Sequence, residues 1–192
     1  MSSRLARSIQ LTDIGGLAFL VVALTSQKRE LRTELQETHK RAERPYPGMA
    51  LPELRLARLE GGDSVTLAPR NGIRQILFYF TTSCPVCLET LPEWKQIAAE
   101  LADAPPGAIE IYGISFDSAA VTAAYANRHQ LNFPILLTRP EVRIEQLYRA
   151  IGVPLTMIVD TGVVSYARFG TLRSRNAALD SIRKQASDSL RQ

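Results

Sequence analysis

Two cysteines carry the clearest chemistry in this sequence of 192 residues. Cys84 and Cys87 stand three positions apart in the run Cys-Pro-Val-Cys, and the chain has no other cysteine. A haem attached through such a pair needs a histidine directly after the second cysteine, where Leu88 stands. A structural zinc ion needs four ligands, and the chain adds only two distant histidines. The pair therefore predicts a dithiol–disulfide couple with no metal or other cofactor, and two ordinary buried cysteines are the alternative.

The flanking sequence explains why such a pair would be reactive. Residues 75–81 form a continuous apolar run typical of a buried strand, and residues 85–101 follow a helical pattern in which Pro85 suits the first turn. A cysteine at the start of that helix faces unsatisfied backbone N–H groups and the positive end of the helix dipole, which favour the thiolate. We therefore predict that Cys84 is the attacking thiolate and that Cys87, one turn deeper, resolves the mixed disulfide.

The sequence after residue 47 alternates between strand and helix patterns. This order predicts an α/β fold in which a mixed central sheet is covered by helices on both faces. Two short strands should flank the turn at residues 61–63, and a strand hairpin should turn at residues 160–162. The predicted strands are residues 54–59, 65–67, 75–81, 109–115, 134–137, 155–159 and 163–169, and the predicted helices are residues 85–101, 118–129, 141–151 and 174–190.

The N-terminal part of the sequence predicts a membrane anchor followed by a stalk. Residues 8–27 contain one charge, Asp13, and 20 helical residues span roughly 30 Å, which is the thickness of the hydrocarbon core. The most apolar part, residues 14–24, is short for a span, so a cleaved signal peptide and an interfacial or soluble helix are the alternatives. We divide the chain into a membrane anchor (residues 1–27), a charged helical stalk (28–46) and a redox domain (47–192).

The formal charge of +4 does not indicate a nucleic-acid-binding surface. Residues 1–50 contain eight Lys/Arg and five Asp/Glu, which gives +3 and leaves about +1 for the remainder. Binding of phosphate backbones needs basic residues clustered on the folded domain. The sequence therefore predicts no nucleic-acid partner.

Several motifs together resemble the thioredoxin superfamily. Cys-Pro-Val-Cys lies between a strand and a helix, and Gly-Val-Pro-Leu-Thr, at residues 152–156, opens the predicted hairpin much later in the chain. More narrowly, the sequence resembles the membrane-tethered TlpA/ResA-like thiol-disulfide oxidoreductases, which have a redoxin-type domain. The other segments that carry this resemblance are residues 48–54, 61–65 and 131–135.

The resemblance implies further site residues. It implies a cis peptide bond before Pro154 that faces the cysteine pair. Such a bond would expose the backbone N–H and C=O of Val153 for pairing with an extended client chain. Pro85 and Val86, between the cysteines, would border the same client. The implied activity is disulfide exchange with client proteins.

Three positions depart from the family pattern. Ser83 stands where many relatives have tryptophan, Phe78 replaces the buried aspartate of thioredoxin, and Thr90 replaces a glutamate of some close relatives. A proton acceptor for the second cysteine must therefore come from elsewhere. We expect Asp117, at a strand end, as the first candidate and Glu89 as the second.

The cysteine pair is compatible with three functions. The first is disulfide exchange, in the reducing direction because the Pro-Val dipeptide lacks the histidine that helps stabilise the thiolate of strong oxidants. The second is a MauD-like assembly factor for a disulfide-rich enzyme. The third is a peroxiredoxin-type peroxidase, because residues 81–84, Thr-Thr-Ser-Cys, resemble part of a peroxidatic motif.

Two observations disagree about the side of the membrane. The basic residues after the predicted span favour a cytoplasmic domain by the positive-inside rule. The family resemblance, together with the absence of spare cysteines, favours the oxidising side. We expect a cytoplasmic N-terminus, a single span, a domain in the periplasm or outside the cell, and an upstream electron donor in the membrane. The basic residues are Lys28, Arg29, Arg32, Lys40 and Arg41.

Overall fold

The computed structural model describes residues 23–33, 35, 43–67, 69, 72–138 and 144–172. The chain divides into two compact units, Met1–Glu43 and Arg44–Gln192. In the first unit, residues 23–33 are helical and nearly all exposed, so one helix runs across the predicted boundary between anchor and stalk at residue 27. No helix within the described ranges is both long and apolar enough to cross a bilayer. Most of the predicted span, residues 8–22, lies outside those ranges.

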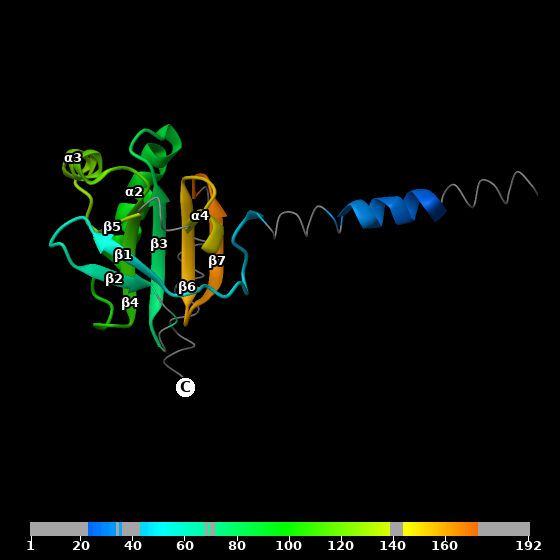
Figure 1. Ribbon diagram of the computed structural model, residues 1–192, viewed down its shortest axis with the longest axis horizontal. Coiled ribbons are helices and arrows are strands. Elements are labelled where there is room, and N and C mark those ends of the chain that lie inside the picture. The colour runs from blue at the N-terminus through cyan, green and yellow to red at the C-terminus, as the bar shows by residue number, and fades with distance from the viewer. Residues whose placement is uncertain are drawn as a thin grey trace, which may run out of the picture. The chain divides into compact units, whose positions relative to one another are not determined.

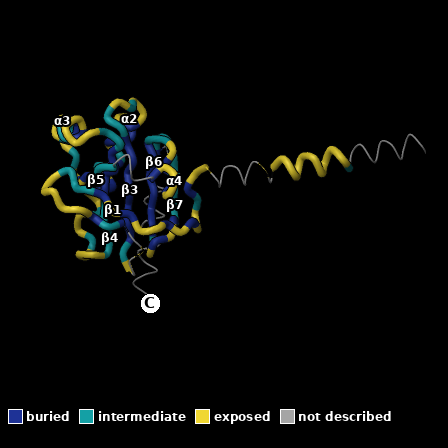
Figure 2. Tube along the Cα trace, viewed as in Figure 1, coloured by how far each residue is buried: buried dark blue, intermediate teal, exposed yellow. Residues whose placement is uncertain are grey.

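The second unit is built on one mixed sheet of seven strands in the order β2-β1-β5-β4-β3-β6-β7 (Figure 1). The central strand β3 pairs in parallel with β4 and antiparallel with β6. All seven of its residues are buried, as Figure 2 shows along the middle of the sheet. Burial on both faces explains why this strand is a continuous apolar run. The strands are β1 (Leu54–Arg58), β2 (Ser64–Leu67), β3 (Arg74–Phe80), β4 (Ile109–Ser115), β5 (Ile135–Leu137), β6 (Leu155–Asp160) and β7 (Val163–Phe169).

Three helices complete the described part of the second unit. These are α2 (Pro85–Glu100), α3 (Ala119–His129) and α4 (Ile144–Leu147). One core cluster joins one face of β3 to α2 and α3 and contains Cys87 and Trp94. The other cluster joins the opposite face of β3 to α4 and the chain around Met49. The predicted mixed sheet with helices on both faces is confirmed.

Most predicted elements agree with the structure to within about two residues, but the predicted helix at residues 141–151 is wrong in extent. Only residues 144–147 are helical, and residues 141–143 lie outside the described ranges. Tyr148 and Ala150 are both buried, and the Tyr148 hydroxyl donates to the Pro52 carbonyl at 2.8 Å. Arg149 between them adopts a left-handed φ of 53°, which ends the helix. The predicted C-terminal helix, residues 174–190, also lies outside the described ranges.

Candidate active site at the start of α2

The turn between β3 and α2 presents the sulfur of Cys84. Cys84 is the residue before the helix, with extended φ and ψ of −82° and 112°, and Pro85 begins the first turn. The backbone N–H of Cys87 donates to the Cys84 sulfur at 3.2 Å. The sulfur therefore caps the helix in the way that a serine or aspartate oxygen usually does. An N–H donor aimed at a half-buried sulfur is an arrangement that can hold a thiolate.

The two cysteines differ strongly in their surroundings. Both are free thiols, Cys84 is half-buried, and Cys87 is fully buried among the residues under α2. Burial, followed by the neighbouring Cys84 thiol, raises the pKa of Cys87 to about 12. The geometry thus makes Cys84 the accessible sulfur and Cys87 the protected one, and the predicted order in which the two thiols react stays a prediction.

The loop before β6 lies against the half-buried sulfur of Cys84. The peptide bond between Val153 and Pro154 is cis, as the family resemblance implies. The Cys84 thiol contacts the Val153 carbonyl, with 3.9 Å between sulfur and oxygen. Two residues after the proline, the Thr156 hydroxyl accepts a hydrogen bond from the buried indole N–H of Trp94 in α2 at 2.8 Å. This hydrogen bond holds the loop at residues 152–154 in a fixed position relative to α2, the helix that begins after Cys84.

Apolar and neutral side chains occupy the positions that depart from the family pattern. The Phe78 ring stacks on Trp94, with ring centres 5.0 Å apart, and meets Phe133 edge-on at 5.3 Å. Thr90 is buried, and its hydroxyl donates to the Val86 carbonyl at 2.8 Å. Ser83 is exposed. The buried position that is an aspartate in thioredoxin is therefore occupied here by Phe78, which packs among aromatic rings.

The two carboxylates predicted as proton acceptors lie in different places. Asp117 follows β4, and its carboxylate accepts a hydrogen bond from the backbone N–H of Thr82 in the cysteine turn. The backbone N–H of Asp117 donates to the Ser115 hydroxyl at 3.2 Å, which fixes the carboxylate in place. Glu89 is exposed on α2. Asp117 is thus tied to the turn that carries Cys84, and its role as proton acceptor stays a prediction.

Sequence reasoning did not single out Tyr125 in α3. Its side chain belongs to the same buried cluster as Cys87, and its ring stacks on Phe80, with ring centres 5.7 Å apart. Burial, followed by the proximity of Cys87 and Cys84, raises the pKa of Tyr125, so its hydroxyl stays protonated at neutral pH. Its helical spacing from Thr122 indicates a buried face, but that spacing does not reveal which partner the hydroxyl meets.

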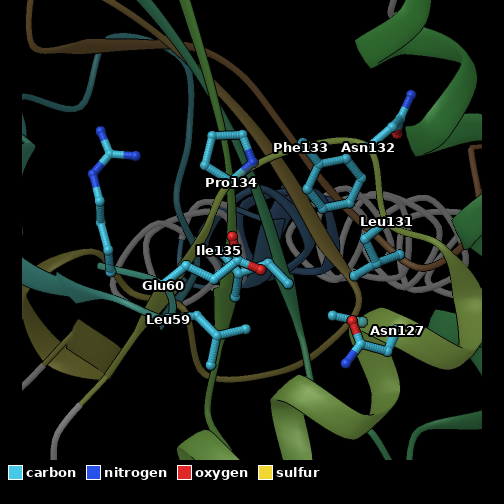
Figure 3. A pocket seen from close by; sticks show the side chains of 10 residues that line it. Leu59, Glu60, Asn127, Leu131, Asn132, Phe133, Pro134 and Ile135 are labelled. Carbon is cyan, nitrogen blue, oxygen red and sulfur yellow. The ribbon is translucent and has the colours of Figure 1, made fainter. Parts of the chain in front are cut away.

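A pocket of about 430 Å³ has neither cysteine in its lining. Figure 3 shows the side chains that surround it. It lies between the end of β1, the last turns of α3 and the segment before β5, and it includes none of the predicted site residues. Within the described part of the chain, no three His, Cys, Asp or Glu side chains gather closely enough to hold a metal ion. The pocket is lined by Arg58, Leu59, Glu60, Ala126, Asn127, Leu131, Asn132, Phe133, Pro134 and Ile135.

Comparison with known proteins places the domain in a family. Residues 47–167 match the model of the AhpC/TSA family. The thioredoxin-like protein YneN of Bacillus subtilis is 26% identical over 133 residues, which cover 67% of this chain and 74% of that protein. Among solved structures, StoA from Bacillus subtilis is similar, with 17% identity, a TM-score of 0.57, and coverage of 71% of this chain and 99% of that one.

The thioredoxin domain of a thiol-disulfide oxidoreductase from Bacteroides vulgatus is also similar. It is 19% identical with a TM-score of 0.59, and the match covers 70% of this chain and 96% of that one. At these identities the two structures establish the fold alone. The family match covers more than half of the chain, and the cysteine turn, the sheet order and the cis-proline loop all lie within it. The chain therefore belongs to the AhpC/TSA family and carries a redoxin domain of the thioredoxin superfamily.

Proposed function

We propose that this thioredoxin-like oxidoreductase reduces disulfides of client proteins through Cys84 and Cys87. The observation that carries the proposal is the contrast between the two sulfurs. The Cys84 sulfur is partly exposed and lies between the Cys87 N–H at 3.2 Å and the Val153 carbonyl at 3.9 Å, whereas Cys87 is fully buried. A client sulfur can approach the first cysteine but not the second.

The reaction takes two exchange steps. The Cys84 thiolate attacks one sulfur of a client disulfide, so that a mixed disulfide forms and the other client sulfur leaves as a thiolate that takes up a proton. Cys87 then loses its proton and attacks the Cys84 sulfur, which releases the second client thiol. The client gains two electrons, and the pair ends as a disulfide. Because the pKa of Cys87 is about 12, the second step needs a proton acceptor, and Asp117 remains the first candidate.

The client would lie across the loop that faces Cys84. An extended chain can pair with the backbone of Val153, next to the buried Pro154. Apolar side chains border this position: Val86 is 39% exposed and Ile151 is 56% exposed. Pro85 and Val86 would contact the client on the helix side, and Ile151 on the loop side. This arrangement favours an extended, partly apolar client segment.

The membrane placement is part of the proposal. The apolar composition of residues 8–27 and the family resemblance support an uncleaved anchor, with the domain in the periplasm or outside the cell and an electron donor in the membrane that re-reduces the pair. A reporter that is active only outside the cytoplasm, fused after Gln192, should give signal. Activity of a cytoplasmic reporter at the same junction, without that signal, would refute this topology.

Trapping of mixed disulfides tests the proposed chemistry. Cys87→Ser should accumulate covalent complexes with a disulfide-containing client, because the resolving thiol is missing. Cys84→Ser should form none, and the Cys84→Ser/Cys87→Ser double variant is the matched control. Complexes formed through Cys87 would refute the assignment of roles. Rapid peroxide consumption by the wild type, with no client reduction, would favour the peroxidase instead. Reduction confined to one partner enzyme would favour the assembly factor.

A further inference from the structure

Two arginines lie beside the loop that faces Cys84. The guanidinium carbon of Arg149 lies 5.4 Å from the centre of the Tyr46 ring, and that of Arg44 lies 5.3 Å from the centre of the Phe169 ring. Stacking on an aromatic ring restricts a long side chain while its charge is kept. Both cations therefore have defined positions.

The Arg44–Phe169 pair connects directly to the loop at residues 152–154. A Cβ atom added to Gly152 would lie 3.6 Å from the Phe169 ring, so that ring packs against the loop. The residue after Phe169, Gly170, donates its N–H to the Pro154 carbonyl at 2.9 Å. The chain of contacts from Arg44 thus ends at the residue next to Val153, whose carbonyl contacts the Cys84 sulfur.

Arg149 is close to the same loop along the chain. It lies three residues before Gly152, in the segment where α4 ends, and its φ of 53° is unusual for a residue other than glycine. Backbone in this region is held by its surroundings and is often found at functional sites. Here Tyr148 and Ala150, both buried, hold the backbone on either side of Arg149, whose side chain is only half-buried.

Among the described residues, no carboxylate is found in an ion pair with either guanidinium. One ion pair among the described residues joins Arg74 to Asp160, at the opposite end of β3. Within the described ranges, the contacts of the Arg44 and Arg149 guanidiniums are those with the Phe169 and Tyr46 rings. The charge of Glu53 acts on Tyr148, the residue before Arg149, where burial first and Glu53 second raise the pKa of the hydroxyl. Within the described part of the chain, two positive charges thus have no acidic partner near the loop at residues 152–154.

We propose that Arg44 and Arg149 select clients whose reactive cysteine is followed or preceded by acidic residues. This inference rests on the proposed exchange activity and adds a specificity to it. A client strand paired with Val153 must pass Gly152 and Ile151, which brings its flanking side chains toward the two guanidiniums. Complementary charge speeds encounter and suppresses like-charged partners, and it acts most strongly at low ionic strength.

The experiment compares two peptides, each with one disulfide, that differ only in having glutamate or lysine beside the cysteine. At low ionic strength, we expect the wild type to reduce the acidic peptide with a kcat/KM about tenfold higher, mainly through KM. The preference should shrink in 1 M salt, where charges are screened beyond about 3 Å. Arg44→Gln and Arg149→Gln should each reduce the preference, and the double variant should abolish it.

The controls separate charge from structure. Arg44→Lys and Arg149→Lys keep the charge and should keep most of the preference. Arg55→Gln, on β1 near the other edge of the sheet, should change nothing. All variants should reduce a small neutral disulfide at the wild-type rate, which shows that they fold. Equal reduction of both peptides by the wild type would overturn the inference alone, whereas reduction of neither peptide would overturn the proposed function itself.

Discussion

The two ends of β3 have different chemistry. Where the strand begins, the Arg74 guanidinium pairs with the Asp160 carboxylate, and the Gln75 amide donates to Glu110 at 2.9 Å. Where it ends, the chain turns to Cys84, whose sulfur is partly exposed and has one backbone donor and one distant carbonyl. Polar groups at the first end are matched with partners of opposite charge or hydrogen-bonding type. At the second end, the sulfur of Cys84 stays partly exposed.

The two ends of β3 thus contribute differently: one end stabilises the sheet, and the other end positions the turn that carries Cys84. The paired polar groups hold β3, β4 and β6 together where β3 begins, which we call the closed end. The end of β3 that leads to Cys84, which we call the open end, leaves the sulfur accessible. The Trp94–Thr156 hydrogen bond lies between them and connects the cysteine helix to the loop of Val153. Changes at the closed end should therefore alter stability, and changes at the open end should alter exchange.

The largest effect on stability should come from the closed end. Arg74→Ala leaves the Asp160 carboxylate without its partner, and loss of one member of a largely buried pair costs about 3 kcal/mol. Urea unfolding of the reduced protein measures the loss. Arg55→Ala, which removes an exposed arginine on β1, should cost less than about 0.5 kcal/mol. If folded Arg74→Ala exchanged disulfides much more slowly than the wild type, the two ends would not be separable.

A smaller effect should follow when the connection between the two ends is broken. Thr156→Val keeps the side-chain shape but leaves the buried Trp94 N–H without an acceptor, which costs about 2 kcal/mol. Exchange with a protein client should slow as well, because the Val153 loop loses its tie to α2. Unfolding and client reduction are measured on the same sample. Thr156→Ser restores an acceptor and should recover most of both properties.

The sequence predicts these two ends unequally. The apolar run of β3 and the Cys-Pro start of α2 depend on neighbouring residues, so local pattern was enough to find them. The early end of α4 depends on the Tyr148 hydroxyl reaching Pro52, which is far away in the sequence. The contact between Asp117 and Thr82 also joins residues that are far apart in the sequence. Because of this contact, Asp117, which the sequence predicts as a proton acceptor, also holds the turn that carries Cys84. Such partners are set by the tertiary fold alone.

The buried thiol at the open end should make stability depend on alkaline pH. The pKa of Cys87 is about 12 in the folded protein, above the value of about 8.5 for an unfolded cysteine. Above pH 8.5 the unfolded chain therefore releases a proton that the folded chain keeps, so the free energy of unfolding falls as pH rises. Urea unfolding of reduced protein between pH 7.5 and about 9.5 should show this decline. Cys87→Ala should flatten it, and an equally steep decline in that variant would contradict the assignment.

The smallest effect should come from the Tyr125 hydroxyl. Tyr125→Phe keeps the ring stack on Phe80 but removes a polar group near both sulfurs, so alkylation of Cys84 at pH 7 should slow about two- to threefold. Tyr79→Phe is the matched control, because the Tyr79 hydroxyl is buried without a hydrogen-bond partner among the described residues and lies in the other core cluster. Equal slowing in both variants would mean that the Tyr125 hydroxyl has no specific influence on the site.

We propose that Cys84 is the reactive sulfur and that Cys87 is the protected one. The most direct test is alkylation of the folded, reduced protein with iodoacetamide at graded pH, with each modified cysteine assigned by mass spectrometry. The contrast in exposure and the Cys87 pKa of about 12 predict modification of Cys84 first at every pH up to about 9, with Cys87 modified only after unfolding. Modification of Cys87 first, or of both at the same rate, would contradict this account.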